Sequence, residues 1–300
     1  MNEIANLGLQ SNNNSQPASL LQAIASFTAE SGMAETPVGE AAGSQRVWDE
    51  ISSRSVLDRL LSSADQINRA RLLAASTLHS GAWLQAVPLP NLGLALGDET
   101  TRSSVALRLG APVCQPHRCR CGRMIDLLGH HGLSCRYSAG HSPHHTNLND
   151  VGKRGLAMAG IPSWLEPVGL DRGDGRRPDG ITVFPYSGGK CLCWDATCVD
   201  TFSQSSVMES ALHPGSAAMA AEARKREKYA ALSTRYRFEA VAVETSGVIG
   251  PSSLEFLNGL GRRMTACTGD RRETQWLIQR LGIAIARGNA AAILASGHTS

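Results

Sequence analysis

Three carboxylates and two lysines stand out in the sequence because together they could bind a metal ion and cut a phosphate ester. Glu166, Asp179 and Asp195 each lie in or beside a segment whose residues favour a β-strand. Lys225 and Lys228 follow on a segment with helical periodicity. If neighbouring strands bring the acids together, their oxygen atoms suit a hard divalent cation, and a lysine beside them can orient or activate water. These residue types therefore point to hydrolysis of phosphodiester bonds.

Most of these residues also have a simpler interpretation. Residues 177–180 read Arg-Pro-Asp-Gly, an ordinary turn sequence, and Glu166 could pair with a nearby arginine. The two lysines could lie on a solvated helix face. Asp195 is harder to explain in this way, because it lies among apolar residues and a buried carboxylate is costly without a partner. The order of the whole set favours the metal site more than any one residue does.

Charge is divided unevenly along the chain. Residues 1–45 contain four acids and no basic residue, so with a net charge of +3 for the whole chain the remainder carries +7. A modestly basic body suits a nucleic-acid partner, although ordinary surface charge explains the same number. Residues 1–45 are rich in Asn, Ser, Gln and Gly. We expect them to be largely disordered, with a short helix around Leu20–Thr28.

A cluster of cysteines and histidines lies between residues 114 and 135. Its density of Cys and His, with glycines that allow tight turns, predicts a tetrahedral structural zinc site. The gap of one residue between Cys119 and Cys121 is tighter than usual, so a neighbouring residue could replace one ligand, and a group of incidental reduced cysteines is the simpler alternative. The expected ligands are Cys119, Cys121, His131 and Cys135, with Cys114, His117 or His130 as alternates.

The cysteine pattern and the absence of certain segments also predict where the protein works. Clustered cysteines are typical of metal sites in a reducing intracellular compartment, and Met1–Gln10 lacks the basic start of a signal peptide. The apolar run Ile283–Leu294 is interrupted by Arg287 and Asn289, so we expect no membrane span there.

Periodicity predicts helices and strands in an order typical of an α/β sandwich. A helical region covers residues 46–110, with an irregular connector at 80–90. After the cysteine cluster, the expected elements are a helix from Asn147 to Gly160, a strand near Glu166, strands 181–184 and 191–199, a helix at 217–232, a strand at 238–244, and helices at 252–264 and 272–294.

The ordered motifs resemble the restriction-endonuclease-like, or PD-(D/E)XK, fold. More narrowly, they are similar to the endonuclease at the C-terminus of non-LTR retrotransposon polyproteins, in which a zinc knuckle precedes the nuclease. The resemblance covers about residues 46–294 and rests on the knuckle at 119–135, His145 with Asn147, Arg177-Pro178-Asp179, Asp195, and Lys225 with Tyr229.

The resemblance implies a role for each matching residue. Asp179 and Asp195 would hold Mg²⁺ or Mn²⁺, and Glu166 matches the acid at a helix or strand end. The family's acid-x-Lys triplet is broken here, because Asp195 is followed by Ala196 and Thr197. A lysine of the next helix would take that role. The candidates are Lys225 with Tyr229 on the same helical face, then Lys228, and the expected nucleic-acid contacts are His145, Arg154, Arg177 and Arg224.

The resemblance further implies a mixed sheet flanked by helices, preceded by a helical segment and a small zinc knuckle. The expected domains are a disordered segment 1–45, a helical linker 46–110, the knuckle 111–140 and the endonuclease 141–300. The function would be target-site nicking by a metal-dependent endodeoxyribonuclease in the nucleus. DNA would be its partner, with the element's RNA as a second candidate and no membrane; nothing in the sequence sets the number of subunits.

Two other functions fit the same residues. One is a catalytically inactive, zinc-containing nucleic-acid-binding protein, decayed or domesticated from such an element. The other is a host nuclease of the same fold with no connection to transposition. The sequence contains no Tyr-x-Asp-Asp box typical of polymerases, so we do not expect this chain to copy RNA.

Overall fold

The computed structural model describes residues 18–33, 36–138, 141–170 and 177–297. It divides into two compact units, Met1–Asp65 and Gln66–Ser300. The division lies inside the region 46–110 that the sequence predicts as one helical linker. The finer domain limits, at residues 45, 110 and 140, stay predictions.

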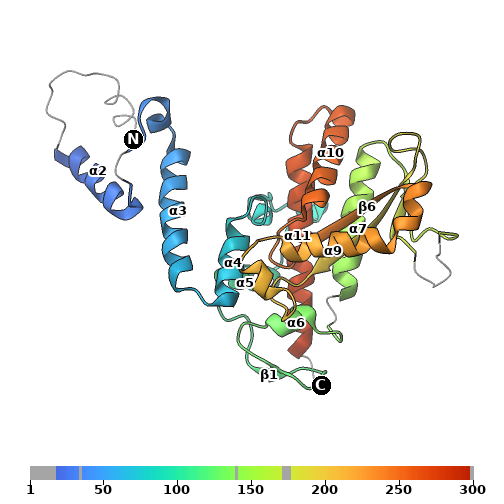
Figure 1. The fold of residues 1–300 in the computed structure, drawn as a ribbon, viewed down its shortest axis with the longest axis horizontal. Helices are drawn as coiled ribbons and strands as arrows, with labels where there is room; N and C mark the ends of the chain where they lie inside the picture. Colours follow the sequence, from blue (N-terminus) through green and yellow to red (C-terminus); the bar gives the residue numbers. More distant parts are fainter. Residues whose placement is uncertain (1–17, 34–35, 139–140, 171–176, 298–300) are drawn as a thin grey trace. The chain divides into compact units, whose positions relative to one another are not determined.

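The described part of the first unit is helical. It contains α2 (Ala18–Ser31), the 3₁₀ helix η1 (Gly39–Gly43) and α3 (Gln45–Ser63) (Figure 1). The rings of Phe27 and Trp48 meet edge to face at 4.6 Å, and the Ser55 hydroxyl donates to the carbonyl of Glu30 at 2.9 Å. The short helix expected around Leu20–Thr28 is thus part of α2, whereas residues 1–17 of the expected disordered segment lie outside the described residues.

The second unit is mixed α/β, as the sequence predicts for the class. Its described strands are β1 (His117–Arg118), β2 (Met124–Ile125), β3 (Ser163–Leu165), β4 (Gly180–Thr182), β5 (Leu192–Val199) and β6 (Arg237–Glu244). Its described helices are α4 (Gln66–Ser76), η2 (Ala82–Gln85), η3 (Pro90–Leu92), α5 (Asp98–Leu109), α6 (His130–Ser134), α7 (His141–Met158), α8 (Val207–Ser210), α9 (Ser216–Lys228), η4 (Ala230–Thr234), α10 (Pro251–Thr268), α11 (Glu273–Leu294) and η5 (Ala295–Gly297).

One helix begins earlier than the sequence predicts. The helix expected from Asn147 is α7, and it begins at His141. Pro143 lies within its first turn, where the missing N–H group breaks no helical hydrogen bond. The consequence is that His145 lies on the helix, where its direction is fixed by the helical geometry.

A mixed four-stranded sheet with the order β3-β4-β5-β6 forms the centre of this unit. β3 and β4 are antiparallel, as are β4 and β5, whereas β5 and β6 are parallel from Leu192–Arg237 to Val199–Glu244. A parallel pair needs a long crossover connection, and α9 lies within it. The sheet therefore places the ends of β4 and the middle of β5 side by side.

Helices pack on both faces of the sheet. On one face, Trp194 and Ala196 of β5 and Val243 of β6 form one core with apolar residues of α7, α10 and α11. On the other face, Ala218 and Ala221 of α9 pack against Ala242 of β6 and Val199 of β5. Because side chains alternate along a strand, Asp195 points to the α9 face. Small alanines allow α9 to approach that face closely.

The central helix α11 is apolar because it lies in the core. By length and composition α11 could cross a membrane, but 72% of its apolar window is buried inside the fold. Leu277, Leu281 and Ile285 of this helix belong to the main core. Helices α7 and α10 pack against α11 and cover this apolar surface.

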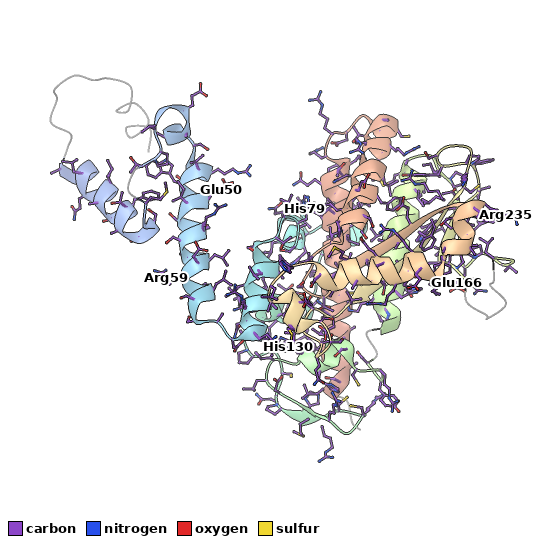
Figure 2. All side chains as sticks on the ribbon, in the orientation of Figure 1. Glu50, Arg59, His79, His130, Glu166 and Arg235 are labelled. Carbon is purple, nitrogen blue, oxygen red and sulfur yellow. The ribbon has the colours of Figure 1, made fainter. Side chains whose placement is uncertain are left out.

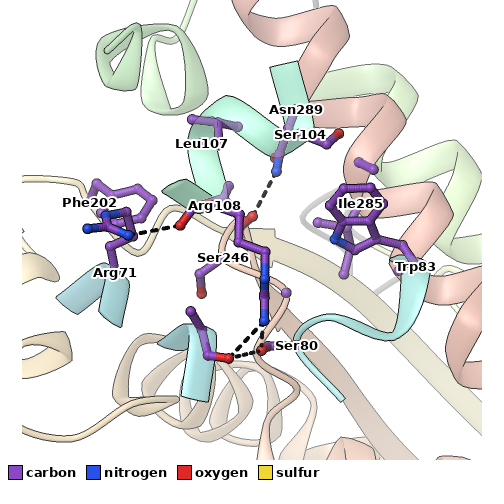
Figure 3. Close-up of a pocket in the computed structure, with 15 residues that line it drawn as sticks. Arg71, Ser80, Trp83, Ser104, Leu107, Arg108, Phe202, Ser246, Ile285 and Asn289 are labelled. Carbon is purple, nitrogen blue, oxygen red and sulfur yellow. Dashed lines mark hydrogen bonds between the residues drawn. The ribbon is translucent and has the colours of Figure 1, made fainter. Parts of the chain in front are cut away.

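Two arginines brace the helices that lead into this core. Arg71 donates to the carbonyl of Arg108 at 2.9 Å, and Arg108 donates to the carbonyl of Ala75 at 2.8 Å (Figure 3). These carbonyls lie in the last turns of α5 and α4, where a helix leaves them without internal partners. The arginines line a cavity of about 50 Å³, and their hydrogen bonds to backbone indicate a structural role.

Candidate functional site

Asp195 is the centre of a buried ion-pair cluster between β5 and α9. Its side chain is almost fully buried, and it lies opposite two lysines of α9. Lys225 Nζ forms an ion pair with Asp195 Oδ1, and Lys228 Nζ lies 3.5 Å from Oδ2. A buried carboxylate is costly unless a cation or strong hydrogen bonds offset the lost hydration. The two lysines supply that compensation, so both lysines that the sequence singles out meet the same acid.

Asp179 lies directly beside Asp195 at the start of β4. The backbone N–H of Asp179 donates to the carbonyl of Trp194 at 2.9 Å. Its carboxylate accepts the backbone N–H of Ala196 at Oδ2 (2.6 Å) and contacts His145 Nε2 through Oδ1 (2.9 Å). With 8% of its surface exposed, it is nearly as buried as Asp195. The structure thus brings together the two carboxylates that the sequence predicts as metal ligands.

His145 approaches this pair from α7. The hydrogen bond to Asp179 raises the pKa of His145 above its usual value, and the charges of Asp179 and Asp195 act in the same direction. Partial burial of the ring and the positive charge of Lys225 oppose this shift in pKa. The half-exposed imidazole therefore adds a proton-accepting group with a raised pKa at the edge of the carboxylate pair.

Asn149 supports His145, and the sequence interpretation did not name it. Its Nδ2 lies 3.5 Å from both ring nitrogens of His145, and its Oδ1 accepts the indole N–H of Trp194 at 3.1 Å. The expected partner, Asn147, lies on another face of α7. The sequence feature that could have identified Asn149 is its spacing of four residues from His145, which places both residues on one side of a helix.

Trp194 is held by a glycine that the sequence interpretation also did not single out. Gly180 pairs with Trp194 across β4 and β5. A Cβ atom at Gly180 would overlap the ring of Trp194. The indole therefore needs a residue without a side chain at position 180, and its position in turn fixes Asn149.

Tyr229 positions the end of α9. Its ring is fully buried, and its hydroxyl donates to the carbonyl of Arg177 at 2.8 Å. Lys228 Nζ lies 2.6 Å from that hydroxyl and 4.3 Å from the ring centroid. Tyr229 thus supports Lys228 and the segment before Asp179. The catalytic position that the resemblance implies for Tyr229 stays a prediction.

Glu166 does not complete a group of three carboxylates. Its backbone N–H donates to the carbonyl of Asp179 at 2.7 Å. The side chain of Glu166, which Figure 2 labels, is 66% exposed and pairs with Arg177. The left-handed backbone at Glu166, with φ of 48°, turns the chain at the end of β3. Within the described residues, no set of three acids and histidines comes within common ligand distance here. Of the two interpretations of Glu166, the ion pair with a nearby arginine is the one that the structure contains.

The other predicted nucleic-acid contacts are dispersed. Arg154 is exposed on α7 and pairs with Asp150 at 2.7 Å. Arg224 is exposed on α9, next to Lys225. Arg177 is tied to Glu166 through its side chain and to Tyr229 through its carbonyl. Of the four predicted contacts, only His145 touches a carboxylate of the buried pair.

No protein-family model matches this chain. A search of curated proteins likewise finds no match. Function is therefore argued from the geometry of two side-chain clusters, the carboxylate pair with its lysines described above and the Cys/His cluster described next.

The second cluster is formed by Cys119, Cys121, His131 and Cys135, the four residues predicted as zinc ligands. Their four ligand atoms all lie within 4.8 Å of one another. Cys119 Sγ and Cys135 Sγ are 3.5 Å apart, and Cys121 Sγ is 3.1 Å from His131 Nε2. Zinc–sulfur bonds of about 2.3 Å in a tetrahedron separate two sulfurs by about 3.8 Å. The cluster is thus close to the size that a zinc ion requires.

Local structure explains how these four side chains meet. Cys119 and Cys121 lie in the turn of the β1–β2 hairpin, which is closed by the bond from Cys119 N–H to Arg123 O at 2.8 Å. Gly122 has a φ of 89°, a conformation that glycine adopts without strain. His131 and Cys135 come from α6 and its C-terminal end, four residues apart on one face.

The alternate ligands make other contacts, although Cys114 also packs against Cys119, Ile125 and Cys135. The ring of His130 stacks on Phe202 with centroids 4.5 Å apart (Figure 2 labels His130). Burial lowers the pKa of His130. Cys114 Sγ donates to the carbonyl of Asp126 at 3.2 Å, and His117 contacts the backbone of Gln115 and the hydroxyl of Ser296. Among the described residues, the four ligand atoms that come together are therefore those of Cys119, Cys121, His131 and Cys135.

The thiols of the cluster differ in acidity. A backbone N–H of Arg123 lowers the pKa of Cys121 to about 6, and His131 acts in the same direction. Burial raises the pKa of Cys135 to about 11. A metal ion binds thiolates, so Cys121 is the thiol already suited to metal binding near neutral pH.

Proposed function

We propose that this protein is a divalent-metal-dependent DNA endonuclease with a restriction-endonuclease-like fold, related to the nuclease region of non-LTR retrotransposons. The observation that carries the proposal is the placement of Asp179 and Asp195 on neighbouring strands with Lys225 against Asp195. Two acids and a lysine from these elements, in this order, are what the resemblance requires. The helices on both faces of the mixed sheet agree with such a fold.

Asp179 and Asp195 are the residues that would hold Mg²⁺ or Mn²⁺, since carboxylate oxygens are the ligands these ions prefer. When bound, the metal supplies stabilisation of the charge that develops on the phosphate. The chain's own side chains would orient the water, balance charge and position the carboxylates. Lys225 orients the attacking water beside Asp195, and Lys228 keeps the charge of that acid balanced. His145 holds Asp179 in place and presents positive charge to an incoming phosphate.

The zinc cluster would hold nucleic acid rather than take part in cleavage. Exposed arginines surround it, namely Arg118, Arg120 and Arg123 of the hairpin and Arg136 after α6. Arginine is well suited to phosphate contacts, and a structural zinc would fix the hairpin that carries three of them. DNA, and in second place the element's RNA, would be the partner, in the nucleus.

Nicking of supercoiled plasmid tests the proposal. We expect the wild type to nick the plasmid with Mg²⁺ or Mn²⁺, and Asp179→Ala and Asp195→Ala to abolish nicking. Binding of duplex DNA, measured by mobility shift, should stay within about twofold for both variants. Parallel loss of nicking and binding would show instead that the two acids are structural.

A second function is favoured by one specific observation. All four oxygens of the two carboxylates already have donors, from Lys225 and Lys228 for Asp195 and from His145 and Ala196 for Asp179. Such a satisfied cluster would also stabilise a catalytically inactive, zinc-containing nucleic-acid-binding protein. Salt-sensitive DNA binding without any metal-dependent nicking would identify this second function.

A further inference from the structure

A groove between α7 and α11 has no role in the site described above. It has a volume of about 400 Å³, within the range of pockets that hold small molecules. Side chains of α7 form one wall and side chains of α11 form the other, and these two helices pack along each other. Residues 91–94, which include the end of η3, close one side.

Three arginines line this groove. Arg154 comes from α7, and Arg280 and Arg287 come from α11. Arg154 pairs with Asp150, whereas among the described residues Arg280 and Arg287 form no ion pair with an acid. Arg287 donates to the carbonyl of Ala95 at 2.9 Å and Arg280 contacts the sulfur of Met158 at 3.3 Å. A guanidinium has five N–H donors, so these contacts leave donors for an anionic ligand.

Apolar side chains make up much of the remaining lining, and we call them the apolar floor of the groove. They belong to Val151 and Met158 of α7, Ile283 and Ala284 of α11, and Leu92 and Leu94 of the segment 91–94. Asp150 also lines the groove, where it is paired with Arg154. A ligand that matches both features carries negative charges along one edge and flat or apolar groups along the other. A single nucleic-acid strand has this character, because its bases are unpaired and its phosphates are regularly spaced.

The groove lies on the far side of α7 from the carboxylate pair. Arg154 follows His145 by nine residues, which is two and a half turns at about 3.6 residues per turn. The two side chains therefore leave the helix in opposite directions. A ligand in the groove would not occupy the place of the phosphate that is cut.

We propose that this groove binds single-stranded nucleic acid as a second contact surface, with Arg280 and Arg287 on its phosphates and the apolar floor against its bases. The proposal rests on the proposed function only in taking nucleic acid as the partner. It does not require that the carboxylate pair cut DNA.

Fluorescence anisotropy with a labelled oligo-dT tests the proposal on the full chain, without added Mg²⁺ so that no cleavage occurs. We expect Arg280→Gln/Arg287→Gln to weaken binding of the oligonucleotide by at least tenfold. Since each phosphate contact contributes about 0.7 to the slope of log K against log salt for single strands, the slope should fall by about 1.4. Affinity for a duplex of equal length should change by less than threefold.

Two further variants control for packing and for general charge. Arg280→Lys/Arg287→Lys keeps both charges and should recover the salt slope. Arg102→Gln/Arg262→Gln removes two exposed arginines of α5 and α10 and should leave oligo-dT binding within twofold of wild type. Melting temperature measured for each variant shows whether the fold is retained, and the lysine variant remains informative if the glutamine variant is unstable.

Three results would overturn the proposal. These are unchanged oligo-dT affinity in the glutamine variant, an equal loss of affinity for single strand and duplex, and tighter groove-dependent binding of poly-glutamate than of oligo-dT, which would indicate an acidic protein partner. Nicking assays on Asp195→Ala separate this result from the proposed function. If the wild-type protein fails to nick DNA while the glutamine variant loses oligo-dT binding, this pair of results would support binding in the groove and refute the proposed nuclease activity.

Discussion

Lys225 on α9 forms an ion pair with Asp195 on β5, across 30 positions of sequence. The pair depends on where α9 sits, and two buried glutamates hold that helix. Glu244 at the end of β6 accepts the N–H of Ala218 in the first turn of α9 at 3.2 Å. Glu222 on α9 accepts the N–H of Ser253 in the first turn of α10 at 2.9 Å. Carboxylates at helix N-termini are stabilising, so the sheet, α9 and α10 are joined through polar contacts that set the position of both lysines.

Loss of Lys225 should destabilise the fold. Lys225→Met leaves a buried carboxylate with only the longer contact to Lys228, so we expect a loss of about 2 kcal/mol in the free energy of unfolding. Urea unfolding measures this loss. Lys190→Met is the matched control, because Lys190 is exposed and, among the described residues, its ammonium group donates only to the backbone carbonyl of Ser233. Equal stability of the two variants would show that the Lys225–Asp195 pair contributes nothing to the fold.

Metal removal should unfold the hairpin and α6 region. We expect one zinc ion per chain by elemental analysis, and loss of that zinc in Cys135→Ser. Cys114→Ser should keep its zinc, because Cys114 contacts backbone and lies outside the ligand set. Loss of zinc in both variants, or in neither, would contradict the assignment of the four ligands.

His145 should titrate above its usual range. Its hydrogen bond to Asp179 raises the pKa in the folded state. The contact therefore contributes its full stability below the unfolded value of about 6.5, and this contribution is lost as the pH rises through the higher folded pKa. An NMR titration of the His145 ring should show a lower pKa in Asp179→Asn than in wild type. A wild-type pKa at or below 6.5 would rule out the described contact in solution.

Gly180 should not tolerate a side chain. Gly180→Ala places a methyl group into the ring of Trp194, so the indole or the strand must shift. We expect a loss of about 1–3 kcal/mol in thermal or urea unfolding. Gly97→Ala is the control, because a Cβ atom at Gly97 meets nothing within 4 Å. A stability loss no larger than that of the control would show that Trp194 is not packed against Gly180 as described.

The sequence by itself determined the order of the main strands and helices after the Cys/His cluster, and the identity of that cluster. The strands around 181–184, 191–199 and 238–244 and the helices that follow them were predictable, because alternation and helical periodicity are local properties. The meeting of Cys119, Cys121, His131 and Cys135 was also predictable, since all four lie within a short stretch of chain. Short-range spacing limits which side chains can meet.

Tertiary structure alone decided the directions of the remaining side chains. The sequence grouped Glu166 with the two aspartates, yet the turn at the end of β3 directs its carboxylate to Arg177. It ranked Lys225 above Lys228, yet the placement of α9 brings both to Asp195. These outcomes depend on strand register and on helix packing against the sheet, which contacts between distant residues fix. No local pattern in the sequence carries that information.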